Sequence, residues 1–246
     1  MAAAGAAAAV IGVAAGPAAA STPAARAPNI TIWGPPISSS IVSGYAAEAS
    51  GPGQSFTLVQ DAFVIPKVTC DGPGIAQFGV GLGGNPIGDQ SSTQQVMVSA
   101  TCKPHNLTPT YAAGYEQGSA SMVTEFIPSA GDAVALRVSA SGIHYKMSMQ
   151  DNTNKDSFGI IVKCSTCQNS SAQVTAGSPA GSTPADFGKV HFTQIQVIGS
   201  PGGAGGLVNA AWNTAKLIQL GSPHTVAEPL QSLGPPPHSA FWDKWK

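Results

Sequence analysis

The sequence predicts an all-β protein built as an antiparallel sandwich with little helix. No long segment repeats apolar residues at the i, i+3, i+4, i+7 spacing of an amphipathic helix. Short segments that alternate apolar and polar residues recur instead, divided by clusters of Gly, Pro, Asn and Ser, as is typical of short strands joined by turns. With 246 residues, 29 Gly and 20 Pro, we expect one sandwich of the concanavalin-like or jelly-roll type over residues 29–246.

The alternation is clearest in five predicted strands, which are residues 55–65, 133–141, 143–149, 158–162 and 189–197. The first stops at Pro66, and Ser141-Gly142 reads as a hairpin turn between the second and third. In the fifth, Val190, Phe192 and Ile195 share the core face only if the register shifts after Phe192. We therefore predict a β-bulge there.

The C-terminal part reads as strands between loops. Residues 199–214 and 222–239 are rich in Gly and Pro, and we expect them to be flexible loops. Residues 215–220 form a possible strand between them. Residues 240–246 are predicted as the last strand, with Phe241 and Trp245 on one face and Trp242 on the other.

Composition excludes several classes of partner. Charged residues make up 9% of the chain, the formal net charge is −1, and no basic block occurs, so we expect no nucleic-acid partner. No apolar run of about 18 residues occurs beyond the N-terminus, so we expect no membrane association once a signal is removed. We expect a monomer that works without a cofactor.

Residues 1–28 are interpreted as a signal peptide or a disordered leader. The first 20 are almost all small and apolar, and Ala18-Ala19-Ala20 supplies a small-x-small cleavage pattern. No Lys or Arg precedes the apolar run, which departs from an ordinary signal. The favoured interpretation is a protein that is secreted to the extracellular space.

Four cysteines allow three pairings, and sequence alone does not choose among them. Disulfides are the default in an exported chain, and we predict the pairs Cys70–Cys102 and Cys164–Cys167. A redox-active C-x-x-C at 164–167 lacks the expected βαβ context. A zinc site lacks a second close pair of cysteines. Both remain minor alternatives.

The sequence contains few familiar catalytic motifs. No two histidines have metal-ligand spacing, so no metal is expected, and no G-x-S-x-G elbow occurs. The glycine-rich residues 79–84 lack the Lys-Ser/Thr ending of a phosphate loop, and glycines in a strand more often mark bulges or close backbone approach.

Several phrases, in order, resemble the glutamic peptidase (eqolisin) family of secreted β-sandwich endopeptidases. They lie at residues 43–45, 62–68, 80–84, 108–116, 131–134, 185–193 and 241–246. In that family a Glu acts as general base on the attacking water, and a Gln amide holds the water and donates to the oxyanion. The resemblance places Gln95 at the Gln position, Gln94 at the preceding acid, and Cys102 at the following cysteine.

The same resemblance places Ser171 at the position of the catalytic Glu, and no Glu occurs between Glu125 and Glu228. Family aromatic residues fall on Gly79 and Gly114. The resemblance therefore implies a cleft that has lost its base and part of its aromatic lining.

The residues expected to line this cleft beside Gln95 are Gln94, Tyr111 and Tyr115, with a peptide or protein as ligand or substrate. We predict a secreted glutamic-peptidase-like protein with weak or no endopeptidase activity. One alternative is an active acid endopeptidase whose base is Glu116, Asp89 or Asp186, although Glu116 reads more readily as a solvated or hydrogen-bonded strand residue. Another is a peptide- or carbohydrate-binding module on the same fold.

Overall fold

The computed structural model describes residues 36–84, 92–221, 225–230 and 239–246, and all of its regular elements are strands. In chain order they are β1 (Ile37–Ser39), β2 (Val42–Glu48), β3 (Ser55–Val64), β4 (Gly74–Leu82), β5 (Gln94–Cys102), β6 (Thr110–Gln117), β7 (Val123–Phe126), β8 (Ala133–Ser141), β9 (His144–Asp151), β10 (Ser157–Lys163), β11 (Ser171–Gly177), β12 (Lys189–Ser200), β13 (Gly203–Gly205), β14 (Asn213–Leu220), β15 (Thr225–Pro229) and β16 (Ser239–Trp245).

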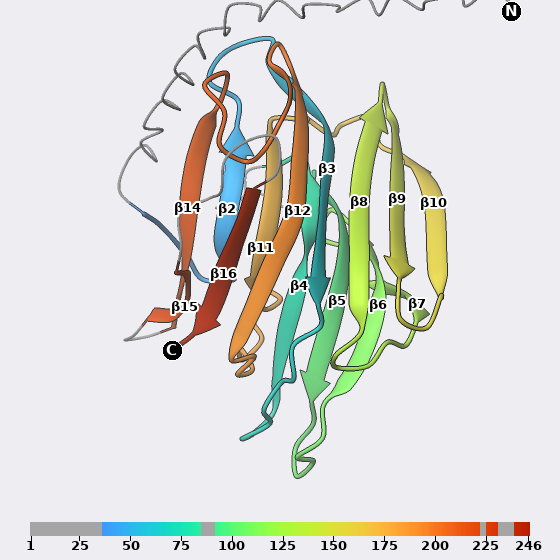
Figure 1. The fold of residues 1–246 in the computed structure, drawn as a ribbon, viewed down its shortest axis with the longest axis vertical. Helices are drawn as coiled ribbons and strands as arrows, with labels where there is room; N and C mark the ends of the chain where they lie inside the picture. Colours follow the sequence, from blue (N-terminus) through green and yellow to red (C-terminus); the bar gives the residue numbers. More distant parts are fainter. Residues whose placement is uncertain (1–35, 85–91, 222–224, 231–238) are drawn as a thin grey trace, which may run out of the picture.

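The strands pair in the order β10-β9-β8-β3-β12-β16-β15-β14-β2-β11-β4-β5-β6-β7, and β1 and β13 pair with β14 and β12. Every pairing is antiparallel except that of β1 with β14. The path folds over so that β3, β8, β9 and β10 form one layer and β11, β4, β5 and β6 lie behind it (Figure 1). The prediction of an all-β antiparallel sandwich is confirmed.

The hairpin and the bulge predicted from the sequence are both present. Gly142, between β8 and β9, has φ +60°, which a glycine adopts without steric cost. The register of β12 against β16 shifts between Phe192 and Ile195, and Gln194 has φ 55°. This extra residue returns Val190, Phe192 and Ile195 to the core, where each is at most 1% exposed.

Aromatic side chains from both layers fill the space between them. Phe63 on β3 packs against Phe78 on β4 and against Phe192 on β12. Phe78 also meets Phe187 edge to face. At the side of the sandwich Tyr45 on β2 packs against Phe241 on β16. Burial of these rings supplies much of the apolar contact that holds the layers together.

Both predicted disulfides are confirmed, Cys70–Cys102 and Cys164–Cys167. The last strand also has the predicted orientation. Phe241 is buried, Trp245 packs against Phe187 on the same side, and Trp242 on the other face is 38% exposed.

Two segments expected to be loops contain strands. Residues 199–214 include β13, and Leu207 and Trp212 within them are buried because the Trp212 indole fills space beside Phe56 and donates to the Leu207 carbonyl. Residues 222–239 include β15, and their remaining part at 222–224 and 231–238 lies outside the described residues. The predicted leader at 1–28 also lies outside them. Among the described residues no helix is long and apolar enough to cross a membrane.

Candidate peptide-binding cleft

A cleft of ≈ 690 Å³ lies over β11, β4, β5 and β6, on the face of the sheet that is turned away from the core. Its floor comes from every second residue of these strands, because successive side chains of a strand point to opposite faces. Residues 118–122, after β6, and 178–180, after β11, border it. The principal floor residues are Gln77, Gly79, Gln95, Met97, Glu116 and Thr175.

Glu116 lies at the centre of a small polar network in this cleft. The Gln95 amide donates to Glu116 Oε2 at 2.9 Å, and the Gln77 amide donates to Oε1 at 3.4 Å. Burial raises the pKa of Glu116, and the hydrogen bonds from Gln95 and Gln77 partly offset that rise. Among the described residues that line the cleft, Glu116 is the only acid.

The register of the sheet explains why these groups meet. Gln95 on β5 is directly opposite Glu116 on β6, so their side chains stand next to one another on the same face. Gln77 lies two strands from Glu116 and was not identified from the sequence. The signal that marks it is the period of β4, which puts it on the same face as Gly79 and Gly81.

Glycines keep the cleft floor low. A Cβ added to Gly79 would lie 2.3 Å from the Val96 carbonyl oxygen, and one added to Gly114 would lie 1.9 Å from that of Val123. The strands approach so closely here that no side chain fits without a shift of backbone. A flat floor of this kind gives another backbone room to lie against the sheet.

Ser171 does not line the cleft. It lies at the start of β11, is 1% exposed, and has its hydroxyl 3.0 Å from the carbonyl oxygens of both Gly83 and Gly84. These contacts satisfy the hydroxyl inside the turn that follows β4. The position where the resemblance places the general base therefore holds a structural hydrogen bond.

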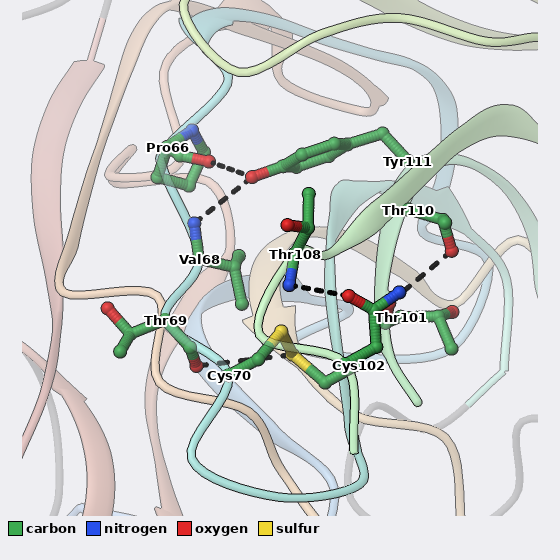
Figure 2. The surroundings of a disulfide bond; sticks show 10 residues. Pro66, Val68, Thr69, Cys70, Thr101, Cys102, Thr108, Thr110 and Tyr111 are labelled. Atoms are coloured by element: carbon green, nitrogen blue, oxygen red, sulfur yellow. Dashed lines mark hydrogen bonds between the residues drawn. A yellow bond between two sulfur atoms is a disulfide. The ribbon is translucent and has the colours of Figure 1, made fainter. Parts of the chain in front are cut away.

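Three other residues expected in the cleft lie on the opposite, core-facing side of their strands. Gln94 is buried and its amide donates to Cys167 Sγ at 3.3 Å. Tyr115 is buried and packs near Phe158. The half-buried Tyr111 donates its hydroxyl to the Pro66 carbonyl and accepts from the Val68 amide, each at 3.0 Å, close to the Cys70–Cys102 disulfide (Figure 2).

Asp186, one of the alternative carboxylates, does not join the network. Asp186 accepts a hydrogen bond from the Gly188 amide at 2.7 Å and does not line the cleft. Asp89 lies outside the described residues. No group of three or more His, Cys, Asp or Glu among the described residues is arranged to hold a metal ion.

The sequence matches the Peptidase A4 family over residues 40–228, and the chain belongs to that family, the eqolisin or glutamic peptidases. Its fold is similar to scytalido-glutamic peptidase bound to a transition-state analogue inhibitor, with a TM-score of 0.67 and 16% identity over 84% of this chain and 98% of that one. It is also similar to SCP-B, an eqolisin family member in complex with the tripeptide Ala-Ile-His, with a TM-score of 0.63 and 15% identity over 84% and 98% of the two chains. A comparison with curated protein sequences finds no match.

The chemistry available in the cleft follows from this geometry. The Gln95 amide donates one hydrogen to Glu116, and its second hydrogen can donate to a carbonyl oxygen. Glu116 accepts from one amide at each oxygen, which fixes the carboxylate in place. The site therefore offers one amide hydrogen for donation and one carboxylate that can accept a proton.

Proposed function

We propose that this chain binds an extended peptide in the cleft and hydrolyses it weakly or not at all. The proposal rests on the hydrogen bonding of Glu116, whose two oxygens are both held by glutamine amides. A base and an amide must both reach the attacking water, and here Glu116 Oε2 and one Gln95 amide hydrogen are bonded to each other, while no second acid lines the described part of the cleft. By accepting this hydrogen bond, Glu116 orients the Gln95 amide so that its second hydrogen can donate to a ligand.

The shape and chemistry of the cleft favour a peptide as ligand. The floor over Gly79 leaves room for a backbone, and the second amide hydrogen of Gln95 suits a peptide carbonyl. Because the backbone groups of these strands are paired within the sheet, a ligand on this face is bound by side chains such as the Gln95 amide and not by strand addition. The tripeptide named for SCP-B supports the same class of ligand.

A second candidate is a slow endopeptidase that uses Glu116 as its base. The 2.9 Å bond from Gln95 places an amide and a carboxylate side by side, and each carboxylate oxygen retains a further lone pair. Because burial raises the pKa of Glu116, this candidate predicts cleavage that increases as pH rises through that raised pKa.

One experiment separates the two. Fluorescently labelled, carboxymethylated lysozyme serves as the denatured chain, with binding measured by anisotropy and cleavage by mass spectrometry from about pH 3 to about pH 7. We expect binding without appreciable cleavage. Rapid cleavage that Gln95→Ala and Glu116→Gln both abolish would contradict the proposal and establish the peptidase.

We also propose that the protein is exported and acts as a monomer outside the cytoplasm. Two disulfides support export, because such bonds persist mainly in oxidising compartments. The test is to express the chain with residues 1–28 included in a secreting host and to look for the protein in the culture medium. Recovery of the full-length protein only in the reducing interior of the cells would contradict export.

A further inference from the structure

We propose that Gln173 completes the cleft: its side-chain amide, and not the Ser171 hydroxyl, is the group on β11 that binds the backbone of a peptide held against Gln95. This inference rests on the proposed peptide binding and names a residue that contributes to it. The supporting observations are the register of four strands, the space above Gly81, and one unsatisfied oxygen.

The register places Gln173 in line with the polar network. Gln173 on β11 is opposite Gly81 on β4, Gly81 is opposite Gln95 on β5, and Gln95 is opposite Glu116 on β6. These four residues form one row across the sheet; Gln95 and Glu116 line the cleft, and Gly81 and Gln173 continue the row beside it. Ser171 is two residues earlier on β11 and so falls outside this row.

Gly81 leaves room for the Gln173 side chain, with the Thr93 side chain beside it, its Cγ2 3.0 Å from where a Cβ on Gly81 would stand. A Cβ on Gly81 would lie 2.8 Å from Gln173 Nε2 and 3.2 Å from Gln173 Cγ. The Gln173 side chain therefore extends over Gly81, in the direction of β5 and Gln95. A larger residue at Gly81 would displace it, so the glycine and the amide fit one another.

The Gln173 amide has unused hydrogen-bonding capacity. Gln173 is 2% exposed, and its Oε1 has no hydrogen-bond partner among the described residues. An unsatisfied buried oxygen costs about 1–3 kcal/mol, so such a group in a native fold requires a reason. A peptide N–H donated to Oε1 supplies the missing bond, while Ser171 is already satisfied by Gly83 and Gly84.

The position also predicts what a carboxylate would do there. In Gln173→Glu the introduced carboxylate takes a proton from water as the water oxygen bonds to the peptide carbonyl carbon. The C–N bond then breaks, and the same proton passes to the leaving nitrogen. The Gln95 amide donates to the oxyanion during this step. Hydrolysis therefore needs only water in addition to the peptide.

The test measures binding of labelled, carboxymethylated lysozyme to the full chain and to its variants Gln173→Ala and Ser171→Ala. We expect Gln173→Ala to weaken binding about tenfold and Ser171→Ala to change it less than about twofold. Gln173→Leu keeps the volume and is measured in parallel, with thermal melting to confirm that each variant is folded. For cleavage, Gln173→Glu is compared with Ser171→Glu, and only the former is expected to hydrolyse the chain.

The outcomes separate the two proposals. Wild type that does not bind the lysozyme chain overturns the proposed function and the role of Gln173 together. Wild-type binding that survives both Gln173→Ala and Gln173→Leu overturns the role of Gln173 alone. Cleavage by Ser171→Glu without cleavage by Gln173→Glu also overturns it. Loss of binding in folded Gln173→Leu, or cleavage confined to Gln173→Glu, supports it.

Discussion

The two faces of the sheet formed by β11, β4, β5 and β6 differ in almost every respect. The core face carries close-packed apolar side chains, and the cleft face carries amides, glycines and one half-buried carboxylate. Neighbours in sequence, such as Phe78 and Gly79 or Gln95 and Val96, lie on opposite faces. One set of alternate positions therefore specifies the fold, and the other set specifies the site.

This separation explains how a chain can keep the fold of the Peptidase A4 family while the residues of its cleft face vary. Substitution on the cleft face leaves the contacts between layers unchanged, because none of those contacts pass through it. The fold persists while the chemistry changes.

The strongest test compares adjacent residues on β4. Phe78→Ala removes a ring that contacts Phe63 and Phe187, and we expect a loss of about 3–5 kcal/mol in the free energy of unfolding. Gln77→Ala, on the cleft face, should cost less than about 1 kcal/mol. Urea unfolding of both variants measures the difference. Equal costs would show that the two faces are not independent.

The next test concerns buried carboxyl groups away from the cleft. Burial raises the pKa of Asp243 from 3.8 to about 7, with the hydrogen bond from Ser43 opposing the rise. Because the pKa of Asp243 is higher in the folded protein than in the unfolded chain, the contribution of protonated Asp243 to stability is complete below about pH 4. It is lost as pH rises toward 7, up to about 4 kcal/mol. Asp61, buried with neither oxygen bonded among the described residues, has its pKa raised in the same direction.

Asp243→Asn should therefore flatten the fall in unfolding free energy between about pH 4 and about pH 7. The matched control is Asp156→Asn, at an exposed position, which should leave the pH profile as it is. Denaturation curves across this range provide the measurement. A protein whose stability is constant with pH in wild type and variant alike would rule out this role for Asp243.

In the cleft, Glu116→Gln should remove the pH dependence of peptide binding. The ionised carboxylate holds the Gln95 amide, so we expect affinity to fall several-fold as pH drops below the raised pKa of Glu116. The variant should bind weakly at every pH in an anisotropy titration. Glu125→Gln, on the exposed face of β7, is the control and should titrate like wild type.

The smallest expected effect is that of Tyr111→Phe. Loss of the hydroxyl that joins Pro66 and Val68 should cost about 1 kcal/mol of unfolding free energy. Peptide affinity should stay the same, since Tyr111 faces the core side of β6. A variant with intact stability and weakened binding would place this tyrosine in the cleft after all.

Sequence alone predicts much of the scaffold and less of the site. Turn residues, alternation and cysteine pairing identify β8, β9, the bulge after Phe192 and both disulfides, because each is a local or chemically restricted feature. The face occupied by Gln94, Tyr111 and Tyr115 is not predictable from phrase similarity, since a shift of one residue reverses it.

The partner across the cleft depends on register between distant strands. Ser171 and Gln173 are two residues apart and so lie on the same face of β11. Only the pairing through Gly81 to Gln95 distinguishes them. Gln77 likewise reaches Glu116 from two strands away. Such relations arise from the pairing of segments far apart in the chain, which periodicity does not encode.

We propose that the cleft face binds a peptide that it does not cleave efficiently. A crystal structure of the wild-type protein with a blocked peptide, grown over days near neutral pH, tests it most directly. We expect an intact peptide lying over Gly79, with a carbonyl oxygen accepting from the Gln95 amide. A peptide whose bond beside Glu116 of the protein is found cleaved, or a peptide bound away from β4 and β5, would contradict this proposal.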